Sequence, residues 1–88
     1  MTPDAKNLAN AIKLARYKCD NLVLTIFDAY DAAEFGQGRI RQENPNCTTA
    51  DIENIMAFIL KASNAVELAN IMLDLAKQKL QEKMDAES

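Results

Sequence analysis

Two heptad patterns, separated by one segment rich in turn-forming residues, constrain this chain more than any other feature. In the first half, small and apolar residues recur at alternating intervals of four and three, the spacing that keeps one face of a helix apolar. This stripe consists of Leu8, Ile12, Ala15, Cys19, Leu22, Ile26, Ala29 and Ala33. The second half repeats the spacing with Ile52, Ile55, Ile59, Ala62, Val66, Ala69, Leu73, Ala76 and Leu80. The sequence therefore predicts two long helices and an all-α fold.

Capping signals set the expected ends of these helices. Thr2 and Pro3 suit a helix start, because Thr can cap and Pro at the first position loses only an N–H that would stay unpaired. Gly36 is expected to close the first helix through a left-handed conformation. For the second helix either Thr48 or Thr49 could cap, and with Thr48 as the cap Asp51 sits where the acid of a capping box would. The expected helices span about residues 3–35 and 49–84, with an inter-helix loop at 36–48, in one domain of residues 1–88.

The two helices fold most simply as an antiparallel hairpin, but the connecting segment GQGRIRQENPNC is long for a helix–helix turn. One hypothesis makes it a site, in which Gly36 and Gly38 form an anion-binding nest and Arg39 and Arg41 bind phosphate or carboxylate. The other makes it a turn whose arginines pair with acids at the end of the first helix, such as Asp28. We favour the turn, with its arginines contributing to an interface.

Both expected helices are also apolar on a second face. A helix that is hydrophobic on two faces must be covered on both, and a chain of 88 residues with two helices has no third element to do this. We therefore expect a homo-oligomer, most simply a four-helix bundle built from two hairpins. The expected interface residues are Leu14, Leu24, Phe27, Leu60, Asn64, Leu68, Ile71 and Leu75. Asn64 would fix the register if it is buried there, or is an ordinary surface residue if it is exposed.

The residues that carry most enzyme chemistry are scarce. The chain contains no His, the commonest general base and metal ligand. Its two cysteines, Cys19 and Cys47, lack zinc-site spacing and are expected to be reduced thiols. The acids near the loop lack EF-hand spacing, so a solvated surface is the simpler interpretation. We therefore expect no enzyme activity, no catalytic residue, no metal and no cofactor.

The net charge of −3 argues against a general attraction to nucleic acid or to anionic membranes. Basic residues nevertheless gather toward the open end of the expected hairpin, which favours either head-to-tail assembly or an anion site. The candidate ligand-binding residues are Lys6, Asn10, Lys13 and Tyr17 on one face of the first helix, together with Arg39 and Arg41. Such cations, amides and rings suit a phosphate-bearing ligand, although charged helix faces are usually just solvated.

No secretory signal is expected at the start of the chain, and Lys61, Asn64 and Glu67 interrupt its most apolar run, which argues against a membrane span. The expected location is the cytoplasm. The leading functional hypothesis is a non-enzymatic homo-oligomer that binds a protein partner as an adaptor, chaperone or inhibitor. The alternative is a protein that binds or sequesters a nucleotide or another phosphate-bearing small molecule at a subunit interface. RNA binding by a dimeric bundle comes third and is not favoured.

Overall fold

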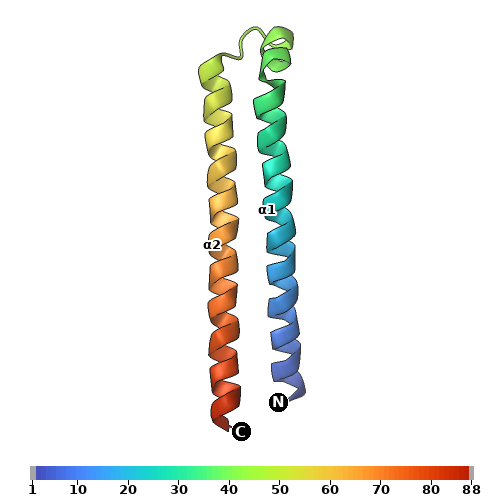
Figure 1. Ribbon diagram of the computed structural model, residues 1–88, viewed down its shortest axis with the longest axis vertical. Helices are drawn as coiled ribbons and strands as arrows, with labels where there is room; N and C mark the ends of the chain where they lie inside the picture. The colour runs from blue at the N-terminus through green and yellow to red at the C-terminus, as the bar shows by residue number, and fades with distance from the viewer. Residues whose placement is uncertain (1, 88) are drawn as a thin grey trace.

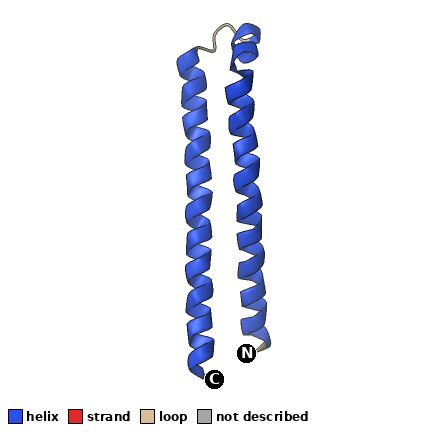
Figure 2. Cartoon of the chain, viewed as in Figure 1, coloured by secondary structure: helices blue, strands red, loops and turns tan. Residues whose placement is uncertain are grey.

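The protein is a single antiparallel helical hairpin, seen in a computed structural model that describes residues 2–87 (Figure 1). Helix α1 spans Pro3–Glu43 and helix α2 spans Thr49–Glu87. They lie side by side in a rod of 65 × 16 × 15 Å, and the described part of the chain contains no strand (Figure 2). The all-α helical hairpin predicted from the heptad patterns is confirmed. Both ends of the chain lie at one end of the rod, opposite the loop.

Helix α1 begins where its capping residues predict. The Thr2 side-chain oxygen accepts a hydrogen bond from the Ala5 backbone N–H at 3.2 Å, and Pro3 occupies the first helical turn. Asp4 adds a negative charge near the positive end of the helix dipole. These local contacts satisfy an N–H group that the helix itself leaves unpaired.

Helix α1 ends eight residues later than the sequence predicts, at Glu43 instead of residue 35. No glycine of the described chain has a positive φ, so Gly36 and Gly38 are ordinary helical residues and the predicted stop at Gly36 is wrong. The helix closes instead at Asn44, whose backbone N–H and side-chain amide both donate to the Ile40 carbonyl oxygen. Pro45 follows, and proline disfavours helical geometry in the residue before it. The loop between the two helices therefore covers only residues 44–48.

Helix α2 begins with the predicted capping box. The Thr48 N–H donates to Asp51 Oδ2 at 2.8 Å, and the Asp51 N–H donates to Thr48 Oγ1 at 3.1 Å. The hydrogen bonds from the Thr48 backbone and side chain hold the pKa of the Asp51 carboxyl below its usual value. The reciprocal pair satisfies two backbone N–H groups at the start of α2.

The surface where the two helices meet, which we call the seam, is rotated relative to the predicted stripes. In α1 it consists of Ala5, Ala9, Ile12, Arg16, Cys19, Val23, Ile26, Tyr30, Ala33, Gln37 and Ile40. In α2 it consists of Ile52, Met56, Ile59, Ser63, Val66, Asn70, Leu73, Leu80 and Met84. One row of each predicted stripe, such as Ile12 and Ile52, is buried as expected. The other row of the observed seam lies one residue later in each helix than the other row of the predicted stripe. Leu22 and Ile55 of the predicted row therefore remain about half exposed, whereas Val23 and Met56 are partly covered.

Candidate functional site

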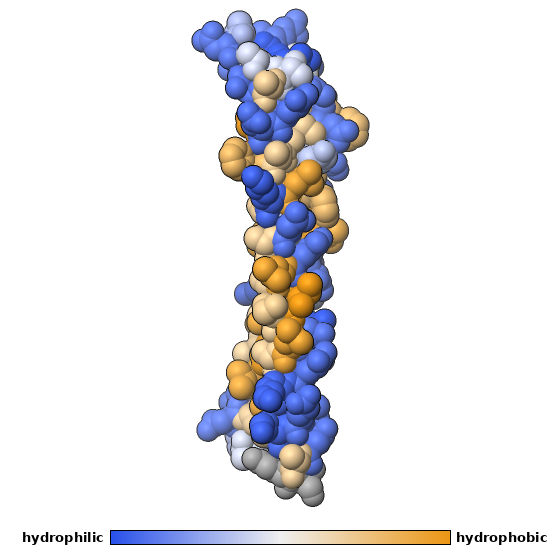
Figure 3. Space-filling model, turned by 90° about the vertical axis from the view of Figure 1, so that its left-hand side faces the viewer, coloured by the Kyte–Doolittle hydropathy of each residue, from blue (hydrophilic) through white to orange (hydrophobic). Residues whose placement is uncertain are grey.

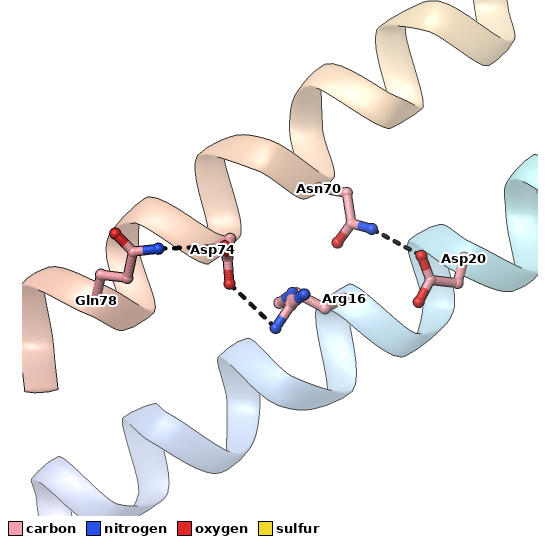
Figure 4. A network of polar contacts seen from close by, with 5 residues as sticks. All are labelled: Arg16, Asp20, Asn70, Asp74 and Gln78. Carbon is pink, nitrogen blue, oxygen red and sulfur yellow. Dashed lines mark hydrogen bonds and ion pairs between the residues drawn. The ribbon is translucent and has the colours of Figure 1, made fainter.

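A small polar network joins the two helices in the half of the rod opposite the loop, close to the middle (Figure 4). The Asn70 side-chain amide donates to Asp20 Oδ1 at 2.7 Å. One turn away, Arg16 Nη1 lies 3.2 Å from Asp74 Oδ1, and the Gln78 amide donates to the other Asp74 oxygen at 3.3 Å. The network places Asp20 level with Asn70 and Arg16 level with Asp74, so it defines the register of the hairpin.

The network contributes more to register than to stability. The side chains of Arg16 and Asp74 are 36% and 42% exposed, and an ion pair in such a setting is worth only about 0–1 kcal/mol. Within the described residues, Arg16 Nε and Asn70 Oδ1 are buried without a hydrogen-bond partner. A seam built partly from such groups is less apolar than the predicted stripes were.

The two flanks of the seam differ sharply in chemistry. Because the helices are antiparallel, rows at the same angular offset from the seam lie on the same side of the hairpin. Asp20 and Asp74 lie on one flank, the polar flank, which also carries Lys13, Glu34 and Glu67 by helical periodicity.

The opposite flank, which we call the apolar face, is made by both helices. From α1 it takes Leu8, Ala11, Ala15, Leu22, Thr25, Ala29 and Ala32, and from α2 it takes Ile55, Phe58, Ala62, Ala65, Ala69, Met72 and Ala76. Its large side chains are uncovered, with Leu8 51% and Phe58 68% exposed. Lys18 is the one charged residue between the ends of this face.

The residues predicted at an oligomer interface are all exposed, but they do not form one surface. By helical periodicity Leu14 and Leu24 lie on the outer side of α1, whereas Leu68, Ile71 and Leu75 lie on the outer side of α2, with exposures from 51% to 65%. We call these two sets the outer lines. Asn64 is exposed beside the α2 line. Phe27 and Leu60 lie on the polar flank. Viewed from the α2 side, apolar residues gather along the middle of the rod with polar residues among them, and polar residues predominate at its ends (Figure 3).

The six predicted ligand-binding residues divide into two groups. Lys6, Asn10, Lys13 and Tyr17 share one exposed face of α1, as their spacing predicts. Arg39 lies at the loop end, about 39 Å from Lys13 at ~1.5 Å per helical residue. The hairpin therefore does not bring the six together in one chain.

The two arginines of the segment GQGRIRQENPNC, Arg39 and Arg41, are helical residues with different surroundings. Arg41 donates from Nη1 to Thr49 Oγ1 at 2.7 Å and from Nε to the Gln37 carbonyl oxygen, so it links the end of α1 to the start of α2. Arg39 is exposed. The expected ion pairs with acids such as Asp28 are not formed, because the one ion pair among the described residues is Arg16 with Asp74. The helical glycines also exclude the anion nest of the site hypothesis.

Possible metal ligands and a possible membrane span can be examined within the described residues. Within residues 2–87 no group of three or more Cys, Asp or Glu side chains is arranged to hold a metal ion, and Cys19 and Cys47 are both free.

One helix, over Thr49–Ala86, is long and apolar enough to cross a membrane, and 6% of its apolar window is buried. A single such helix is weak evidence, because helices that pack in soluble bundles satisfy the same criteria.

The fold and its surfaces define a class, an antiparallel two-helix hairpin with exposed apolar sides. No protein-family model, curated protein or solved structure matches this chain. The function must therefore be argued from the hairpin itself.

Proposed function

We propose that this protein is a non-enzymatic interaction module of the cytoplasm, a helical hairpin that self-associates and binds a protein partner as an adaptor, chaperone or inhibitor. The observation that carries the proposal is the imbalance between covered and uncovered apolar residues. Fourteen large apolar side chains of the described chain are at least 39% exposed. The buried hydrophobic residues are Ile12, Ala33 and Ile52. Soluble monomers rarely expose large apolar patches to water, and this hairpin exposes apolar side chains along the apolar face and along both outer lines.

The division of this surface supports two kinds of partner. The apolar face spans both helices on one side, whereas the outer lines on α1 and α2 point away from each other. A single flat contact covers one of these surfaces and not all three. A second copy on one surface and a different protein on another would cover them with the fewest components.

Native mass spectrometry of the protein as purified tests self-association and ligand retention together. We expect a mass that is a whole multiple of the 9.8 kDa chain, without added small-molecule mass. A monomer across a range of micromolar concentrations would contradict the proposal. Bound mass of a few hundred daltons per chain would instead favour the ligand-binding alternative, with Lys6, Asn10, Lys13 and Tyr17 as its first candidates.

The protein partner requires a separate test. A photo-crosslinking amino acid is placed at Leu68, on the α2 outer line, and the cross-link is formed in living cells that produce the protein. We expect adducts heavier than the homo-oligomer, whereas the same residue at Lys83, near the end of α2, should give few. Adducts that contain only copies of this chain would remove the partner from the proposal and leave self-association.

A further inference from the structure

We infer that the apolar face is the docking surface for a second copy of this chain, which packs with its loop at the opposite end of the rod to form a four-helix bundle. This inference rests on the proposed self-association and names the surface and orientation that it uses. The partner copy would present the same face, so the contact is two-fold symmetric.

The first argument comes from the rotation of the seam. Each predicted stripe combines one buried seam row, such as Ile12 and Ile52, with one row of the apolar face, such as Leu22 and Ile55. The most apolar direction of each helix therefore points between its neighbour in the hairpin and the apolar face. In a four-helix bundle, the core-facing stripe points in this intermediate direction, because each helix contacts two neighbours.

The second argument is the area left in water. The chain exposes 6646 Å², whereas a folded monomer of its 9.8 kDa mass typically exposes about 5,200 Å². The excess is about 1,400 Å² per chain, which falls in the range that one subunit of an obligate homodimer buries. The apolar face is the surface that can be covered in one contact, because both helices contribute to it on the same side.

The third argument is charge, which selects the orientation. When the rod is divided at Leu24 and Val66, the loop half carries six acids and three bases, a net charge of −3, and the open half carries seven of each. Copies with their loops together would place two negative halves side by side. Copies with loops at opposite ends place each negative half against a neutral half, which contains the lysines of the partner's open end.

Cysteine cross-linking tests both surface and orientation. In a background with Cys19→Ser and Cys47→Ser, Ala65→Cys lies on the apolar face near the middle of the rod, where the two-fold axis would pass. We expect this variant to form a disulfide-linked dimer on mild oxidation. Leu68→Cys, on the outer line one turn away, should form at least tenfold less. Leu8→Cys should also fail, because its copies would lie about 48 Å apart.

Charged substitutions supply a second measurement. Ala65→Glu should convert the oligomer to a folded monomer by analytical ultracentrifugation, and Leu68→Glu should leave the assembly intact. Dimers that cross-link through Leu68→Cys, or that survive Ala65→Glu and dissociate with Leu68→Glu, would overturn the assigned face while self-association stands. Cross-linking between Ala65→Cys and Thr25→Cys, without same-residue cross-linking at either position, would overturn the orientation. A wild-type monomer would overturn both the inference and the proposed function.

Discussion

At the residue scale, the Thr48 and Asp51 capping box makes stability depend on pH in a defined direction. Hydrogen bonds from Thr48 lower the pKa of the folded Asp51 carboxyl. Their stabilisation is therefore present above the unfolded pKa of about 4 and is lost as the pH falls through the folded value. We expect Asp51→Asn to be less stable than wild type at pH 7 in urea unfolding, with the difference disappearing in acid.

Glu53→Gln is the matched control for this prediction, because Glu53 lies in the same turn and makes no bond to Thr48. Its stability should follow the wild-type pH profile more closely than that of Asp51→Asn. An Asp51→Asn difference that stays constant from pH 7 to acid would show that the carboxylate charge is not what stabilises the cap. The capping box itself was predicted correctly, since its geometry depends only on residues three apart in sequence.

Arg41 links the two helices at the loop end of the hairpin. Its bond to Thr49 Oγ1 at 2.7 Å joins the two helices, and a second bond reaches the Gln37 carbonyl oxygen. We expect Arg41→Ala to lower the free energy of unfolding by about 0.5–1 kcal/mol, because the bonds are exposed to water. Arg39→Ala, two residues away and exposed, should change stability by less than about 0.5 kcal/mol. Equal effects in chemical denaturation would contradict the bridging role of Arg41.

At the element scale, residues 36–43 are helical and not a loop, which reverses the effect expected from replacing a glycine there with alanine. A methyl group added at Gly38 would meet nothing within 4 Å, and one at Gly36 would lie 3.7 Å from Ile40 Cδ1, an ordinary contact. We expect Gly38→Ala to raise the free energy of unfolding by up to about 1 kcal/mol, because alanine favours the helix and restricts the unfolded chain. Thermal unfolding followed by circular dichroism measures it. A loss of stability would contradict the helical conformation of Gly38.

The elements show which features sequence reasoning can reach. Heptad spacing predicted both helices and the hairpin, because periodicity over many turns outweighs local ambiguity. It missed the end of α1, because a glycine signals either a cap or a tolerated helix interior, and the seam residue Ile40 continues the heptad beyond it. It also placed the second row of each seam one residue early. Periodicity identifies the most apolar direction of a helix, and this direction is shared between the neighbour in the hairpin and the apolar face.

The candidate site was predicted less well than the fold, for a related reason. Spacing along one helix correctly placed Lys6, Asn10, Lys13 and Tyr17 on a common face. Whether Arg39 joins them depends on the length and direction of α1, which local patterns do not contain. The interhelical network of Asp20 and Asn70 was also missed, because the pairing of residues 50 positions apart follows from the hairpin register.

At the scale of the whole molecule, a rod one helix pair wide has too little interior to be stabilised by its own core. The chain leaves large residues such as Leu24 and Phe58 more than 60% exposed, and its extents of 16 and 15 Å leave room for one layer of side chains between the helices. Folding and assembly should therefore be coupled, since any second copy binds the folded hairpin and not the unfolded chain.

This coupling predicts that the melting temperature rises with protein concentration. For a dimer that unfolds directly to separate chains, a hundredfold increase contributes RT ln 100, about 2.7 kcal/mol. With an unfolding entropy of ~2.1 cal/mol/K per residue, this corresponds to about 7 °C. Calorimetry between 5 and 500 μM, approximate working limits for this test, would measure the shift. Ala65→Glu should abolish it and Leu68→Glu should retain it, because only the first substitution lies on the apolar face. A wild-type melting temperature that is independent of concentration would mean that the hairpin is stable alone, and the exposed apolar surface would then need a different occupant.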